Sequence, residues 1–128
     1  MEKKLSCRFE QLKSEYPEAT VEIWAMDEHR LGLKPIFRRV WTPIGVQPTA
    51  EVNWGFQWFW VYGFVHPQSG ETYWWLLPLV NITVFNQVLA DLAEHFSLGK
   101  NKQMILVLDR AGWHSSKNLK IPLGLNLE

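Results

Sequence analysis

The sequence predicts an α/β domain: a mixed β-sheet with helices on its faces. Three observations support this fold class. Stretches rich in β-branched and aromatic residues predict four strands, at residues 20–33, 56–65, 71–77 and 103–108. Apolar residues recur at helical spacing in two other stretches, 2–15 and 81–99. The second predicted helix separates a pair of strands from a later strand, and this order is typical of a sheet with helices packed on it.

Composition excludes several classes of protein. The chain has 128 residues, 47% hydrophobic and 20% charged, which fits one globular domain and excludes a disordered tail, a coiled coil and a collagen-like fibre. Thirteen basic residues balance thirteen acidic ones, so the net charge does not point to a polyanionic partner. Cys7 is the one cysteine, which excludes a disulfide framework and a multi-cysteine zinc site. We see neither a membrane span nor a signal peptide, and we expect a cytoplasmic protein.

The first half of the chain contains a helix, a strand and a loop. The helix at 2–15 carries apolar residues at i, i+4 and i+7 and stops before Pro17. The strand at 20–33 stops before Pro35. Residues 40–48 contain two prolines and a glycine, which indicates a loop.

The second half contains a hairpin, a helix and further strands. The strands at 56–65 and 71–77 are joined by five turn-forming residues and are apolar on both faces, so we expect helices on at least one face. The next helix is capped by Asn81 or Thr83 and closed by Gly99. After the strand at 103–108, the pattern predicts a short helix over 113–120, and the last four residues begin another strand.

Two aspartates stand where carboxylates are unusual. Asp27 lies inside an apolar strand, and Asp109 follows the carboxyl end of another. A buried carboxylate costs several kcal/mol unless it is paired, hydrogen-bonded or bound to a metal. Two carboxylates converging at the carboxyl ends of strands would form an all-oxygen site for Mg²⁺ or Mn²⁺. The alternative for Asp109 is a cap on the following loop or helix.

Two histidines lie near these aspartates. Strand alternation puts His29 on the same face as Asp27, and Glu28 on the other face. His29 either supports a metal ligand or is a partly exposed strand histidine. His114, five residues after Asp109, either reaches back to the site or to a DNA phosphate, or packs at the start of a helix.

Tryptophan and basic residues each allow two interpretations. Most tryptophans are expected in the core or in the packing of helices on the sheet, with a base-stacking platform as the alternative. The eight are Trp24, Trp41, Trp54, Trp58, Trp60, Trp74, Trp75 and Trp113. Basic residues dominate 29–50 and 95–127, and these blocks either form one surface or are scattered, solvated charge.

Three motifs together resemble the catalytic domain of bacterial DDE transposases of the mariner-like superfamily. They are WAMDEHRLGLKP at 24–35, RRVWTPIGVQP at 38–48 and LVLDRAGWHSSKNLKIP at 106–122. The resemblance implies a ribonuclease H-like fold, an antiparallel meander followed by parallel strands with flanking helices, here with the family's last helix missing. It also implies a helical lead-in at 1–19 and an incomplete catalytic domain at 20–128.

The resemblance implies transposase-type cleavage and joining of DNA strands with Mg²⁺ or Mn²⁺. Asp27 matches the first catalytic, metal-binding carboxylate and Asp109 the second, although Arg110 stands where the family more often has asparagine. The family's third carboxylate follows a Pro-Tyr-Ser-Pro-like segment that these residues do not contain, and we do not assign that role to Glu128. We therefore expect this chain alone to be weakly active or inactive.

The resemblance further implies DNA as partner, both transposon ends and target, in a nucleoid-associated protein without membrane contact. A second copy, or the missing transposase portion, is a further expected partner. The candidate DNA contacts are Arg30, Lys34, Arg38, Arg39, Arg110, His114 and Lys117. One alternative is a non-catalytic remnant that acts as a DNA-binding or protein-interaction module. Another is an unrelated α/β metal phosphohydrolase using Asp109, against which the antiparallel hairpin argues.

Overall fold

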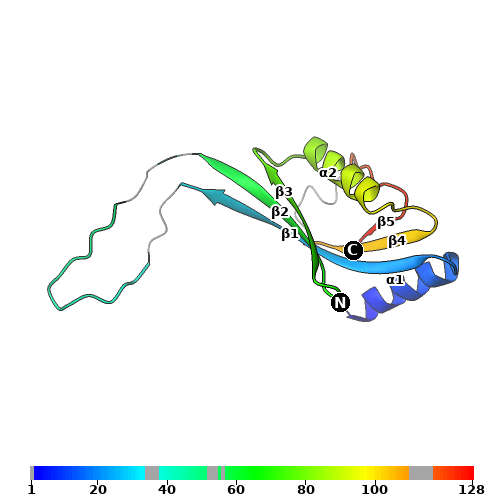
Figure 1. The fold of residues 1–128 in the computed structure, drawn as a ribbon, viewed down its shortest axis with the longest axis horizontal. Helices are drawn as coiled ribbons and strands as arrows, with labels where there is room; N and C mark the ends of the chain where they lie inside the picture. The colour runs from blue at the N-terminus through cyan, green and yellow to red at the C-terminus, as the bar shows by residue number, and fades with distance from the viewer. Residues whose placement is uncertain (1, 34–37, 52–54, 56, 110–116) are drawn as a thin grey trace.

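The protein folds around a five-stranded sheet with one long helix on each side (Figure 1). The computed structural model describes residues 2–33, 38–51, 55, 57–109 and 117–128. The elements are α1 (Glu2–Glu15), β1 (Thr20–Gly32), β2 (Trp58–His66), β3 (Glu71–Leu77), α2 (Ile82–His95), β4 (Lys102–Val107) and β5 (Leu125–Leu127). All six elements expected from the longer patterns are present, and the predicted final strand is β5.

The sheet is mixed, as expected. Its strand order is β3-β2-β1-β4-β5, with β1, β2 and β3 forming an antiparallel meander. The pairs β1–β4 and β4–β5 are parallel. β1 is therefore the central strand and is hydrogen-bonded on both sides.

The main core lies between the sheet and α2. Alternate residues of the strands point toward α2, and each large apolar side chain that is fully buried there contributes about 1.5–3 kcal/mol. The fully buried side chains include Trp24, Tyr62, Phe64, Phe85, Leu89, Leu92, Met104 and Leu106. This layer covers one face of the sheet and confirms that a helix packs on the apolar hairpin.

Capping residues define both ends of α2. Asn81 is the N-cap, and its side chain accepts a hydrogen bond of 2.8 Å from the Val84 N–H. The prediction that Gly99 closes this helix is wrong, because α2 ends at His95 and the left-handed residue is Ser97, with φ 52°. The Leu98 N–H donates to the Ala93 carbonyl over 2.8 Å, which completes a Schellman motif as Leu98 packs on the core.

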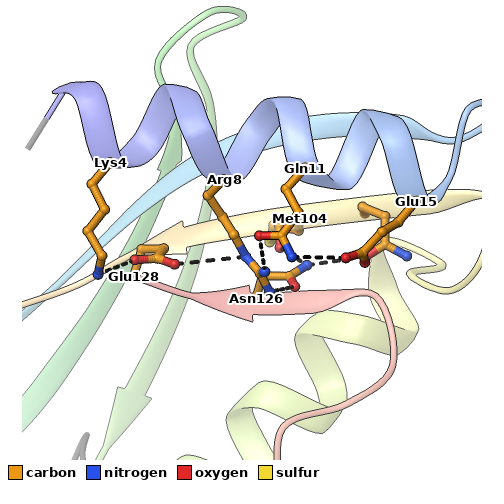
Figure 2. Close-up of polar contacts among 8 residues, drawn as sticks. Lys4, Arg8, Gln11, Glu15, Met104, Asn126 and Glu128 are labelled. Carbon is orange, nitrogen blue, oxygen red and sulfur yellow. Dashed lines mark hydrogen bonds and ion pairs between the residues drawn. The ribbon is translucent and has the colours of Figure 1, made fainter.

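Helix α1 lies on the opposite face, where polar side chains attach it to β5 (Figure 2). Arg8 Nη2 donates to Asn126 Oδ1 over 2.9 Å, and Lys4 Nζ lies 2.7 Å from a carboxylate oxygen of Glu128. Leu12 is buried beneath the helix. These contacts fix α1 on the sheet. The division of the chain into a helical lead-in at 1–19 and a catalytic domain at 20–128 stays a prediction.

The connection between β1 and β2 projects far from the sheet (Figure 1). Its described part, 38–51, is exposed and has no helix or strand, which confirms the loop predicted at 40–48. Trp41 and Ile44 are fully exposed there. This projection separates Arg38 and Arg39 from the body of the protein.

Three smaller predictions need correction. The β2–β3 connection has four residues, 67–70, because His66 still pairs with Glu71. Residues 117–120 form a turn and irregular chain instead of a helix, and 113–116 lie outside the described residues. The expectation for tryptophan holds for three of the six described: Trp24 is buried in the core and Trp60 and Trp75 pack against it, whereas Trp41, Trp58 and Trp74 are exposed.

At the amino-terminal end of the β1–β4 pair, Glu22 is expected to make the stability of the fold depend on pH. Glu22 accepts a 2.9 Å hydrogen bond from Trp24 Nε1 and lies 3.3 Å from Lys102 Nζ. Burial alone would raise the pKa of Glu22, but these hydrogen bonds and the charge of Lys102 lower it below the ordinary value of 4.5. Because its pKa is lower folded than unfolded, ionised Glu22 stabilises the fold above the unfolded pKa, and this stability is lost as pH falls through the folded pKa.

We therefore expect Glu22→Gln to lower the free energy of unfolding by roughly 1 kcal/mol at about pH 7, and by less in acid. Urea unfolding of both proteins from about pH 7 down to about pH 3 measures this difference. A difference that stays constant over the whole range would contradict the role given to the Glu22 charge.

Candidate functional site

The two candidate aspartates belong to neighbouring parallel strands: Asp27 lies within β1, and Asp109 comes two residues after the end of β4. Each residue of β1 pairs with the residue 82 positions later, from Thr20 with Lys102 to Ala25 with Val107. The same offset joins Asp27 to Asp109, two residues beyond the last pair on each strand. Adjacent strands lie about 4.8 Å apart, so the two residues would be neighbours if this register continued for two more positions.

Asp27 is held rigidly by its strand but faces solvent. It pairs with Gly63 on β2, and its Oδ1 accepts a 2.8 Å hydrogen bond from the Glu28 N–H. The expectation that burial forces a partner on Asp27 is wrong, because its side chain is exposed on the face that α2 does not cover. Exposure leaves this carboxylate accessible to a cation.

Strand alternation separates Asp27 from its neighbour Glu28, as predicted. Asp27 and His29 are exposed, whereas Glu28 is half-buried and lies across from Tyr62 in the β1–β2 register. Burial, and then the charge of Glu28, raises the pKa of the Tyr62 hydroxyl, which stays protonated. Glu28 therefore belongs to the α2 side of the sheet, away from Asp27.

Asp109 is exposed directly after β4. The preceding Leu108 N–H donates to the Glu128 carbonyl over 3.1 Å, which holds this end of the chain against the segment that follows β5. The residues that Asp109 would cap lie at 110–116, outside the described residues, so the capping alternative stays open. Both aspartates thus stand at a solvent-facing edge.

The donor set fits a hard divalent cation. Two carboxylates with retained water are a common way for proteins to bind Mg²⁺. Across the described ranges there is no group of three or more His, Cys, Asp or Glu side chains that could hold a metal. Glu128 does not join the aspartates, since its carboxylate lies 2.7 Å from Lys4 Nζ and 3.8 Å from Arg8 Nε.

An open cavity of about 320 Å³ adjoins Asp27 on this exposed face. His29, Gly63 and Trp74 line it together with Asp27. Sequence reasoning did not bring Gly63 and Trp74 to the site, although the hairpin register would have aligned Asp27, Gly63 and Trp74 in one row. A larger cavity of about 750 Å³ lies beside α2 at Asn86 and holds none of the candidate residues.

The described basic candidates do not form one surface. Arg30 lies on β1 with its guanidinium 5.5 Å from the ring centre of Trp58, and Arg38 and Arg39 are exposed on the projecting segment. Lys117 is exposed, and the carbonyl of the next residue, Asn118, accepts a hydrogen bond of 3.1 Å from Asn86 on α2. The other three candidates lie outside the described residues: Lys34, Arg110 and His114.

Comparison with known proteins identifies the family. A model for DDE superfamily endonucleases matches residues 22–121. The uncharacterized protein y4pE/y4sA of Sinorhizobium fredii (strain NBRC 101917 / NGR234) is 30% identical over 70 residues, which cover 55% of this chain and 50% of that protein. The chain thus spans about half the length of this relative.

Solved structures of Mos1 transposase have a similar fold. A pre-cleavage Mos1 transpososome matches with a TM-score of 0.60 and 17% identity, over 98% of this chain and 39% of that chain. The mariner Mos1 paired-end complex with Mg matches with a TM-score of 0.56 and 23% identity, over 84% of this chain and 35% of that chain. At these identities the similarity shows the fold, and it confirms the expected ribonuclease H-like sheet.

In the described part of the chain, no helix is both long and apolar enough to cross a membrane. The family model covers residues 22–121, which include both motif aspartates. The chain therefore belongs to the DDE superfamily endonucleases.

Proposed function

We propose that this chain carries out transposase-type cleavage and joining of DNA strands, with Asp27 and Asp109 as its metal-binding carboxylates. The observation that carries the proposal is the parallel pairing of β1 with β4, whose offset of 82 residues also relates the exposed Asp27 to the exposed Asp109, in a member of the DDE family. Solved relatives include Mos1 complexes with Mg and with Mn, which supports a divalent metal as cofactor.

The chain's own contribution is to hold two oxygen ligands in place. Asp27 projects from the central strand, and the Glu28 N–H occupies its Oδ1 and limits its rotation. Asp109 holds the second position from the end of β4. Two divalent ions, when bound, supply activation of the attacking oxygen and stabilisation of the leaving oxygen in an in-line displacement at phosphorus.

A third acidic ligand is part of this proposal. The described residues contain no group of three or more His, Cys, Asp or Glu side chains that could hold a metal, and Glu128 is engaged by Lys4 and Arg8. We propose that two carboxylates support slow cleavage at most, and that full activity requires an acidic group beyond Asp27 and Asp109.

DNA is the proposed substrate, both transposon ends and target. Arg30, Arg38, Arg39 and Lys117 are exposed and would contact backbone phosphates, which gives affinity that depends on salt and not on sequence. A DNA substrate places the protein in the cytoplasm at the nucleoid, with a second copy or the remainder of a transposase as partner.

A metal-mapping experiment tests the centre of the proposal. Mn²⁺ added to isotope-labelled protein broadens amide NMR signals near its binding site. We expect the broadened signals to come from 25–29, 61–65 and 107–109, and Asp27→Asn to remove the effect. Broadening of other signals, or no broadening, would contradict the proposed metal site. It would favour the second candidate function, a non-catalytic binding module. The fully exposed side chains of Trp41 and Ile44 support that second candidate.

Metal-dependent nicking of supercoiled plasmid DNA tests the activity. Slow nicking in Mg²⁺ or Mn²⁺ that stops in a chelator is the expected result. Efficient cleavage without metal would refute the mechanism.

A further inference from the structure

The face of the sheet that contains Asp27 also presents a tryptophan to solvent. Trp74 is 61% exposed on β3, although an indole is a large apolar group that folding normally buries. The opposite face of the same strands is covered by α2, so the exposure belongs to the Asp27 face alone. This side chain has no role in the core described above.

Gly63 connects Trp74 to the candidate metal site. Gly63 pairs with Asp27 on one side and with Trp74 on the other, so the three residues form one row across β1, β2 and β3. A Cβ atom at position 63 would lie 2.8 Å from Trp74 Cζ3, which shows that the indole lies over this glycine. The absent side chain lets the ring lie flat against the sheet, directed toward Asp27.

The row of residues forms one wall of an open cavity. The cavity measures about 320 Å³ and includes Ala25, Asp27, His29, Gly63 and Trp74. That volume is at the lower end of small-molecule sites, roughly 300–1,000 Å³, and is too small for a helix or a duplex. It combines a flat aromatic surface with a carboxylate two strands away, about 10 Å across the sheet.

We propose that Trp74 stacks on an unpaired nucleobase of the DNA strand whose phosphate lies at Asp27. The inference rests on the proposed function, because it takes its ligand from the substrate of that site. One strand of a duplex advances about 3.4 Å along the axis per nucleotide, and an unpaired strand can extend further, so a separation of about 10 Å corresponds to a base no more than roughly three nucleotides from the reacting phosphate. Stacking on an aromatic side chain is worth about 1–3 kcal/mol per base and tolerates any base.

Binding of single-stranded DNA without metal tests this inference separately from cleavage. The probe is a 12-nucleotide DNA of mixed sequence containing 2-aminopurine, whose fluorescence is quenched by stacking, and the reference is the same sequence as a full duplex. We expect Trp74→Ala to weaken single-strand binding by about 5- to 150-fold and to abolish its share of the quenching. Trp74→Phe should retain most of the affinity, and duplex binding should change little.

Leu76→Ala is the matched control. Leu76 lies two residues along the same strand and face and is 67% exposed, so its removal takes away apolar surface without an aromatic ring. Equal single-strand affinity in Trp74→Ala and wild type would overturn the inference. Equal losses of single-strand affinity in Trp74→Ala and Leu76→Ala would also overturn it. Such losses would indicate that the exposed face of β3 binds through apolar contact in general, as a surface covered by another protein segment would.

Asp27→Asn separates this inference from the proposed function. Stacking needs no metal, so we expect Asp27→Asn to keep the quenching by single-stranded DNA. Quenching at Trp74 together with Mn²⁺ bound elsewhere would refute the proposed metal site alone. Mn²⁺ at Asp27 and Asp109 without an effect of Trp74 would refute the stacking alone.

Discussion

Replacing Asp27 with asparagine is expected to slow metal-dependent nicking of DNA by at least about 100-fold. The substitution keeps the size of the side chain and an oxygen that can accept the Glu28 N–H, but it removes the negative charge that a divalent cation requires. Metal stabilisation of the transition state is worth several kcal/mol, and each 1.36 kcal/mol is about tenfold in rate. Asp109→Asn should have an effect of similar size, because Asp109 is the second proposed metal ligand.

Asp91→Asn is the control for this pair. Asp91 lies on α2 and accepts a hydrogen bond from the Tyr73 hydroxyl, remote from the Asp27 face. This substitution makes the same chemical change and should leave nicking close to wild type. Initial rates of plasmid nicking in Mn²⁺ measure all three variants, with thermal unfolding to check that each is folded. Rates that do not depend on Asp27 or Asp109 would contradict their assignment.

The location of the site could be predicted because it follows from strand polarity. The sequence shows Asp27 in one strand and Asp109 after another, and parallel strands with a helical crossover present their carboxyl ends at the same edge. The actual register of β1 and β4 depends on pairing between segments 82 residues apart and has no local signal. The prediction therefore gave the edge of the sheet but not the alignment.

Exposure could not be predicted, because it depends on where helices pack. The strands are apolar on both faces, and hydrophobicity alone does not say which face a helix covers. The structure places α2 on the Trp24 face and leaves Asp27 and Trp74 open. The exposure of Asp27 and that of Trp74 have this one cause, whereas Trp41 is exposed because it lies on the projecting segment.

Local rules failed where tertiary packing decided the outcome. Gly99 is the residue that sequence rules favour for ending α2, but Ser97 takes the left-handed position because Leu98 can then pack on the core. The contacts of Arg8 with Asn126 join residues 118 positions apart, and no periodicity predicts them. Helices and strands were thus predictable from spacing, whereas their ends and attachments were not.

Gly124→Ala is expected to destabilise the fold by about 2–5 kcal/mol. Gly124 has φ +85°, a conformation that costs other residues about 1–2 kcal/mol. A Cβ there would lie 2.9 Å from the Lys102 carbonyl oxygen and closer still to the Gly99 nitrogen. Both are backbone atoms that share a 2.9 Å hydrogen bond, so neither can move without breaking it, and such overpacking costs about another 1–3 kcal/mol.

The displacement caused by Gly124→Ala should reach the candidate site through β5. The Gly124 carbonyl accepts a 2.7 Å hydrogen bond from the Met104 N–H, which begins the pairing of β5 with β4. Displacing this strand would also displace Glu128, whose carbonyl holds Leu108 just before Asp109.

Gly45→Ala is the matched control for Gly124→Ala. Gly45 has φ +82°, but a Cβ at this position would have nothing within 4 Å, so the substitution should cost only about 1–2 kcal/mol. Urea unfolding compares the two variants. Equal losses would show that backbone conformation alone, without the packing between Gly99 and Gly124, accounts for the effect.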